Sequence, residues 1–278
     1  MQNYKDLLHK VLTEGSHRLT RSGETISIFG EFLEWDMREG FPAVTTKKLA
    51  WKPMVGELLW FINGETSIEA LRHRSDLSPE AWTIWDNDAK RWNQSDTEYD
   101  DLGKLYGYQW RSAGGYVDQL QNLVDTINTD PTSRYMLVMN WNSVDVAQYS
   151  MALPPCHTGF QVYVDGPYID LMWNQRSVDS FLGLPFNIAS YGLLLEILGK
   201  LTGLQPRKLK CSLGDVHIYS NHIPMVEELL QREPLALPTV QLPEMKSLDD
   251  FKEMTAKDFV LVGYQSHPPI KAPLSVGE

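Results

Sequence analysis

The chain has 278 residues, 42% of them hydrophobic, which is enough to bury a full core. It carries 25 Lys and Arg against 36 Asp and Glu, and the resulting net charge of −11 argues against general attraction to nucleic acid or anionic membrane. No stretch approaches the ~20 apolar residues of a membrane-spanning helix, and the first residues are amphipathic rather than signal-like, which favours a cytoplasmic protein.

The first third of the chain predicts two helices and a strand. Residues 3–14 have apolar side chains at helical spacing and are followed by Gly15, which suits a helix end. Residues 25–35 are rich in β-branched and aromatic side chains, which is typical of a strand. Residues 51–64 predict a second helix. Glu57 lies inside the apolar run of this helix, where a carboxylate is unexpected unless it has a specific role.

The remainder predicts a strand-rich layer around a buried helix. Residues 86–103 are polar and indicate a surface loop or small excursion rather than a linker between domains. The stretches 134–141, 159–166 and 168–176 predict successive strands, with Asp165 and Gly166 forming the hairpin turn between the last two. Residues 186–203 are apolar nearly all round, as expected of a core helix. We therefore expect one α+β domain spanning residues 1–278.

"MALPPCHTGF" at 151–160 raises the question of what Cys156 does. With one other cysteine, Cys211, and no signal peptide, a disulfide is not expected. Metal-ligand spacing is absent from the sequence, so a metal site is not expected either. An inert core cysteine and a nucleophile both remain open. His157 alone is weak evidence for a dyad, because adjacent strand residues point to opposite faces.

Two further stretches are rich in groups that bind nucleotides. In "NQRSVDSFLGLPFNIASY", Arg176 and Ser177 suit a phosphate clamp and Asn187 can read a pyrimidine edge. For either residue alone, a surface ion pair of Arg176 or a helix cap by Asn187 would be commoner. In "GDVHIYSNH", His217 and Tyr219 share one strand face and can reach a sugar hydroxyl, or form a satisfied core pair. No GxGxxG, P-loop or nucleophile-elbow motif is present.

Together these stretches make the chain similar to the thymidylate synthase family. The similarity runs from "RSGETISIFG" through "GFPAVTTKKLAWK", "TIWD", "LYGYQWR" and "ALPPCH" to "HPPIKAP". It implies a central mixed β-sheet flanked by helices, with sheet faces packed in a homodimer. It also implies transfer of a one-carbon unit from 5,10-methylenetetrahydrofolate to C5 of dUMP, without a metal and without a nucleic-acid partner.

The similarity implies a role for each matching residue. Cys156 matches the nucleophile that adds to C6, Glu57 the proton-transfer carboxylate, and Tyr106 and Asp179 further catalytic residues. The implied nucleotide ligands are Arg21, Arg176 and Ser177 for phosphate, Arg134 of the partner subunit, Asn187 for the uracil edge, and His217 and Tyr219 for the 3′-hydroxyl. The implied folate contacts are Asp179, Ile84, Trp85, Leu182, Gly183, Phe186 and Ser275.

Physical chemistry adds three expectations. Burial among apolar residues should raise the pKa of Glu57 toward neutrality. Nearby arginines should favour Cys156 as a thiolate. Trp82 and Trp85 can form a wall for a pterin ring.

Several positions depart from the usual family pattern. Tyr135 stands where a second arginine is usual, Asp88 where a tryptophan is frequent, and Gly277 and Glu278 extend the C-terminus. The familiar "SAWN" is replaced by residues 139–142, "MNWN". A looser lid would admit water. Reductive methylation is nevertheless the preferred activity, because synthases are the commoner members of the family and the residue matching the uracil-reading position, Asn187, is intact. Hydroxymethylation of dUMP is the alternative, and a non-catalytic nucleotide-binding homologue is a remote one.

Overall fold

The fold is built on a six-stranded sheet, seen in a computed structural model that describes residues 1–92 and 100–274. The strands are β1 (Ser16–Thr20), β2 (Gly23–Asp36), β3 (Leu137–Met139), β4 (His157–Asp165), β5 (Tyr168–Asp179) and β6 (Gln205–Tyr219). Their order is β1-β2-β6-β5-β4-β3. Strands β5 and β6 pair in parallel and the other neighbours pair antiparallel, so the sheet is mixed, as expected.

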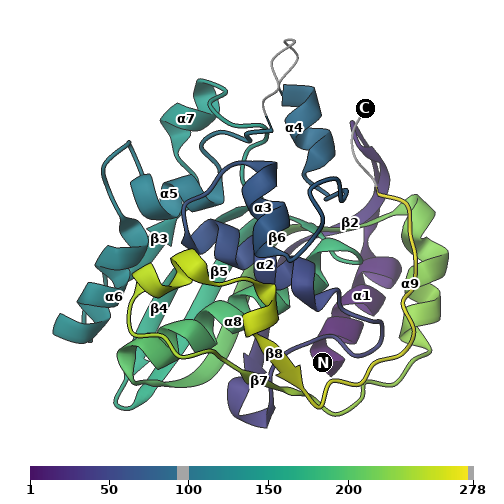
Figure 1. The fold of residues 1–278 in the computed structure, drawn as a ribbon. Coiled ribbons are helices and arrows are strands. Elements are labelled where there is room, and N and C mark those ends of the chain that lie inside the picture. The colour runs from purple at the N-terminus through teal and green to yellow at the C-terminus, as the bar shows by residue number, and fades with distance from the viewer. Residues whose placement is uncertain (93–99, 275–278) are drawn as a thin grey trace.

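Helices cover one face of this sheet. They are α1 (Gln2–Glu14), α2 (Trp51–Ile62), α3 (Ile68–Arg74), α4 (Asp86–Trp92), α5 (Tyr106–Ser112), α6 (Gln119–Thr129), α7 (Ser143–Ala147), α8 (Gly183–Thr202) and α9 (Ile223–Leu230). Helix α8 packs against β5 and β6, and α2 packs against α8 (Figure 1). A small separate sheet pairs β7 (Thr239–Gln241) with β8 (Val260–Val262). Within the described ranges, no helix combines the length and apolarity that crossing a membrane would take.

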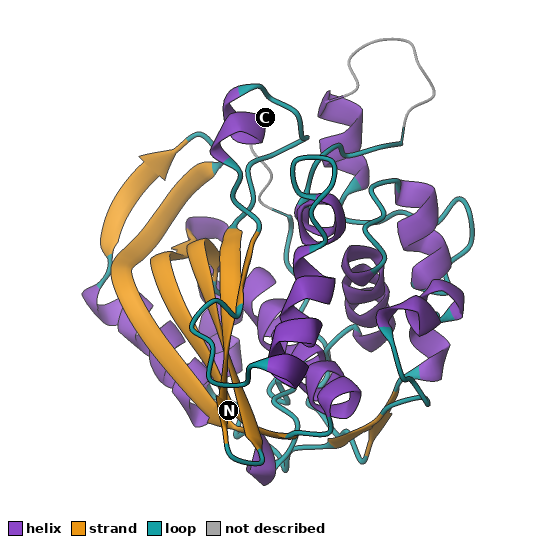
Figure 2. Ribbon diagram, turned by 90° about the vertical axis from the view of Figure 1, so that its left-hand side faces the viewer, coloured by secondary structure: helices purple, strands orange, loops and turns teal. Residues whose placement is uncertain are grey.

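The two faces of the sheet differ in burial. Most helices stand on one side of it (Figure 2). On that side, the neighbouring side chains of Phe160, Trp173 and Cys211 are completely buried. One residue further along each strand, side chains point to the opposite face. There Gln161 is exposed and Met172 and Lys210 are partly exposed, so the outer face is not covered by the core.

The main predicted elements are confirmed. The expected helices correspond to α1, α2 and α8, and the expected strand at 25–35 lies within β2. The β4–β5 hairpin is present, but its loop is Gly166-Pro167, one residue later than predicted. Gly166 has φ of 55°, a left-handed conformation that glycine adopts without strain.

Two segments correct the sequence interpretation. The predicted loop at 86–103 is wrong for its first part, because 86–92 form α4, whose first turn is acidic and last turn basic, as the helix dipole favours; residues 93–99 lie outside the described residues. The predicted strand 134–141 is strand only at Leu137–Met139. The Gln119 amide pairs with the backbone N–H and C=O of Met139, which caps this edge strand.

Candidate active site

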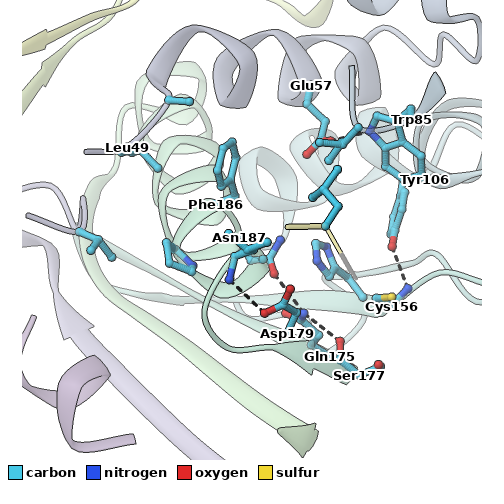
Figure 3. Close-up of a pocket in the computed structure, with 18 of the residues that line it drawn as sticks. Leu49, Glu57, Trp85, Tyr106, Cys156, Gln175, Ser177, Asp179, Phe186 and Asn187 are labelled. Carbon is cyan, nitrogen blue, oxygen red and sulfur yellow. Dashed lines mark hydrogen bonds between the residues drawn. The ribbon is translucent and has the colours of Figure 1, made fainter. Parts of the chain in front are cut away.

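A cavity of about 440 Å³ lies among α2, α4, α5, the start of β4 and the first turn of α8. Its walls include most of the side chains singled out in the sequence, namely Glu57, Ile84, Trp85, Tyr106, Cys156, Ser177, Asp179, Leu182, Gly183, Phe186 and Asn187. Figure 3 shows Glu57 and Trp85 at one end of the cavity and Gln175 and Ser177 at the other. The size is that of a small-molecule site.

Cys156 is a wall residue of this cavity and is held through its backbone. Its N–H donates to the Tyr106 hydroxyl at 2.8 Å, and its carbonyl accepts from the Arg176 N–H at 2.9 Å. Cys156 and Cys211 are both free thiols, so the expectation of no disulfide is confirmed. Cys211 is completely buried in the core, whereas Cys156 is partly exposed. Of the two thiols, only Cys156 lines the cavity.

The electrostatics of Cys156 correct a prediction. Burial raises the pKa of the Cys156 thiol; Arg176 lowers it by less, and Asp88 raises it further. Arg176 therefore acts in the expected direction, but burial outweighs it, because removing the thiolate from water costs more than one partly hydrated guanidinium returns. His157 supplies no positive charge, because burial lowers its pKa to about 4. The raised pKa of Cys156 favours the thiol form at neutral pH.

Arg176 holds the loop that carries the cysteine. Its Nε donates to the Pro155 carbonyl and its Nη2 to the Pro154 carbonyl, both at 2.9 Å. The guanidinium also lies over the Trp141 ring, 5.5 Å from the ring centre. A guanidinium has five N–H donors, so these two bonds leave others for an anion. Because Arg176 is exposed, that anion can reach it from solvent.

Glu57 has the raised pKa that its apolar neighbours predicted. Its Oε1 accepts from Trp85 Nε1 at 2.7 Å. Burial raises the pKa of Glu57 to about 7, and the indole hydrogen bond offsets part of that increase. A carboxyl group with this pKa both donates and accepts protons near neutrality. Trp85 lies in the wall as expected, whereas Trp82 is 55% exposed and lies outside the lining residues.

Asn187 is oriented by a residue that the sequence analysis missed. Gln175 Nε2 donates to Asn187 Oδ1 at 3.0 Å. Gln175 Oε1 accepts from Trp173 Nε1 at 3.1 Å, and since an indole is only a donor, this bond fixes which way the Gln175 amide points. The alternation of side chains along β5 could have revealed this residue, because Gln175 directly precedes Arg176 and therefore faces the opposite side of the strand.

Lys47 is a second wall residue that the sequence analysis missed. Its ammonium group donates to the Phe181 carbonyl and lies 4.0 Å from the centre of the Phe181 ring. Burial lowers its pKa to about 8, while Asp179 acts in the opposite direction. Asp179 itself accepts from the Phe181 and Leu182 N–H groups at 3.0 Å, which fixes the turn into α8.

Five predicted ligands lie outside the lining residues, namely Arg21, Arg134, Arg176, His217 and Tyr219. Arg21 is exposed in the turn between β1 and β2, and Arg134 is exposed just before β3. The His217 and Tyr219 rings are 5.2 Å apart, so they share a strand face as expected. Ser275, Gly277 and Glu278 lie outside the described residues. Within those residues, no cluster of three or more His, Cys, Asp or Glu side chains is arranged to hold a metal.

Comparison with known proteins identifies related sequences along nearly the whole chain. A family model described as "Thymidylate synthase" matches residues 2–276. A "Probable thymidylate synthase" of Escherichia phage T5 is 50% identical over 283 aligned positions, which cover 99% of this chain and 100% of the relative. The "Thymidylate synthase" of Enterobacteria phage T4 is 43% identical over 291 positions, with the same coverage.

Proposed function

Because the chain belongs to the thymidylate synthase family, we propose that residues 1–278 form one catalytic domain that reductively methylates dUMP to dTMP, using 5,10-methylenetetrahydrofolate as one-carbon donor. The observation that carries this proposal is a free thiol, Cys156, in the same cavity as a carboxyl group with a pKa of about 7, Glu57. A nucleophile and a proton carrier together are what carbon alkylation at a pyrimidine C5 needs.

The chemistry proceeds through a bond between Cys156 and the pyrimidine. The Cys156 sulfur adds to C6, and the electrons of the C5–C6 double bond move onto C5 and O4 as an enolate. C5 then forms a bond to the one-carbon unit. Loss of the C5 proton and cleavage of the bond between the one-carbon unit and the folate nitrogen leave an exocyclic methylene on C5 and release tetrahydrofolate. Hydride or water then adds to the methylene, and departure of the Cys156 thiolate from C6 restores the C5–C6 double bond. Glu57 carries protons during these steps. The folate supplies the one-carbon unit and, for methylation, the hydride.

The cavity walls suit both molecules. Asn187 offers an amide to the uracil edge, and the exposed Arg176 lies beside the cysteine loop for the phosphate. We further assign Arg21 and Ser177 to the phosphate and His217 and Tyr219 to the sugar hydroxyl. The apolar wall residues Ile84, Trp85, Leu182 and Phe186 fit a flat heterocycle, with Asp179 as its polar contact.

One observation favours a second activity, hydroxymethylation of dUMP. Asp88, at a position where the family often has tryptophan, lines the cavity and pairs with Arg91. A carboxylate there retains water, and water adding to the exocyclic methylene on C5 would give a hydroxymethyl group and tetrahydrofolate. Hydride addition to the same carbon gives the methyl group and dihydrofolate.

Product analysis tests this proposal. Incubation with dUMP and 5,10-methylenetetrahydrofolate should release dihydrofolate and a methylated nucleotide in equal amounts. Absorbance measures the dihydrofolate, and mass spectrometry identifies the nucleotide. Asp88→Trp should lower any hydroxymethylated fraction, because the indole displaces water. A hydroxymethylated product without dihydrofolate would select the second activity, and absence of any product with intact dUMP binding would contradict both.

The outer face of the sheet supports a homodimer as part of the proposal. Large apolar side chains are exposed along it, among them Phe32 (53%), Leu137 (44%) and Met139 (39%). Phe32 lies on β2 and Leu137 and Met139 lie on β3, so exposed apolar side chains occur toward both sides of this face. Arg134 lies just before β3 at the same edge. We propose that a second copy covers this face and that Arg134 of the partner subunit completes each site.

A charge placed on this face should separate the subunits. Met172→Lys puts an ammonium group beside Lys210 at the centre of the outer face, so light scattering after size exclusion should show a monomer with greatly reduced turnover. Val260→Lys, on the separate small sheet, is the matched control and should remain dimeric.

Mixing inactive Cys156→Ser with inactive Arg134→Ala should restore part of the turnover, since a heterodimer contains one intact site. A mixture that stays inactive would contradict shared sites.

A further inference from the structure

The strand that follows the cysteine begins with an irregularity. Between His157 and Gly159 the pairing of β4 with β5 shifts by one residue, so Thr158 interrupts the regular ladder. Such bulges frequently occur beside active sites, where they change the direction of a neighbouring side chain. Cys156 directly precedes this bulge. Whatever holds the bulge therefore also sets where the sulfur lies.

Asn140 holds the bulge with both its backbone and its side chain. Its backbone N–H donates to the Thr158 carbonyl at 2.9 Å, and its Nδ2 donates to the His157 carbonyl at 2.9 Å. Both carbonyls flank the interruption of the ladder. Asn140 is completely buried, so water does not replace these bonds.

The direction of the Asn140 amide is determined by its partners. Its Oδ1 accepts from Trp110 Nε1, and an indole nitrogen can only donate. The His157 carbonyl can only accept, so Nδ2 must face it. The Trp110 ring is itself held by edge contacts to Phe61 and Phe160, with ring centres 5.7 and 5.4 Å away. The amide therefore connects a fixed aromatic cluster to the segment that carries the nucleophile.

We propose that Asn140 is a positioning residue for Cys156 in this chain. Asn140 does not line the cavity and acts only through the segment 156–158. The inference rests on the proposed function for its kinetic test, whereas its thiol-reactivity test needs neither substrate.

The variant that tests it is Asn140→Ala. Releasing the segment misplaces the sulfur, so kcat should fall about 10- to 100-fold. The dissociation constant of dUMP, measured by calorimetry, should change little, because its phosphate and sugar ligands lie on other segments. Alkylation of Cys156 by iodoacetamide at pH 8, quantified by peptide mass spectrometry, should become faster. Burial raises the pKa of this thiol in the intact protein, and a released segment exposes it.

A matched control separates positioning from general destabilisation. Asn63→Ala removes two side-chain hydrogen bonds, to the Leu59 and Phe251 carbonyls, away from the cavity. It should lower the melting temperature without changing kcat or the alkylation rate. If Asn140→Ala behaves like this control well below both melting temperatures, the proposal is overturned. Should Asn140→Ala fail to fold, Trp110→Phe removes the orienting N–H together with part of the buried ring, and its turnover is measured well below its melting temperature. It should lower kcat with dUMP affinity kept, and an unchanged kcat would overturn the proposal.

Discussion

Cys156→Ser is expected to abolish turnover, with a loss of kcat of at least about 10⁴-fold, while dUMP still binds. The reason is the mechanism itself, because no other free thiol lines the cavity in the described ranges and every later step depends on the sulfur–C6 bond. A serine hydroxyl is a far weaker nucleophile at neutral pH than a cysteine sulfur. The measurement combines the product assay with calorimetric titration of dUMP.

A cysteine elsewhere provides the control for this substitution. Cys211→Ala removes the other thiol from the core, at a site that does not line the cavity. Its turnover, measured well below its melting temperature, should stay near that of the unaltered protein. Retained turnover in Cys156→Ser would refute the covalent mechanism. Loss of dUMP binding as well would show that the side chain holds the nucleotide rather than attacks it.

Much of the site could be predicted because local sequence determines local geometry. The junction of β5 and α8 carries Ser177, Asp179 and Asn187 within a dozen residues, so a strand that ends in a helix necessarily brings them to one place. The raised pKa of Glu57 also follows from its apolar neighbours along the helix. These features depend on residues that are close in the chain.

The features that could not be predicted depend on long-range packing. Whether burial or Arg176 dominates the pKa of Cys156 depends on how deeply the cysteine lies among segments distant in sequence. The hydrogen bonds from Trp110 to Asn140 and from Asn140 to the start of β4 likewise join three separate parts of the chain. Polar residues at 86–92 suggested a loop, but the helix formed because Ala89 packs inward while charges match its dipole.

Glu57→Gln is expected to lower kcat by about 10²- to 10⁴-fold, the usual contribution of a positioned acid or base. The neutral amide can still accept the Trp85 hydrogen bond, so the cavity should keep its shape. Because the pKa of Glu57 is about 7, the unaltered protein should show an inflection of kcat near pH 7. That inflection should be absent from the variant. Measuring kcat between pH 5 and pH 9 checks both statements.

The Glu57→Gln substitution should raise the stability of the protein although it lowers its activity. The folded-state pKa of about 7 lies above the ordinary 4.5, so the folded protein binds this proton more tightly than the unfolded chain does. Protonation of Glu57 therefore stabilises the folded protein, and this contribution is fully present below pH 4.5. The unaltered protein loses about 3 kcal/mol of unfolding free energy as the pH rises from there through 7. The amide side chain of the Glu57→Gln variant has no charge to bury. Denaturant titrations should show this variant gaining stability, relative to the unaltered protein, between pH 4.5 and pH 8.

Glu196 supplies a matched control for this pair of effects. Its pKa is also raised to about 7 by burial, but it lies on α8 outside the lining residues. Glu196→Gln should therefore show the same direction of pH-dependent stabilisation with kcat and its inflection unchanged. Equal losses of kcat in the two variants would mean that a buried charge, rather than proton transfer at Glu57, affects turnover. An inflection near pH 7 that persists in Glu57→Gln would assign the titration to another group.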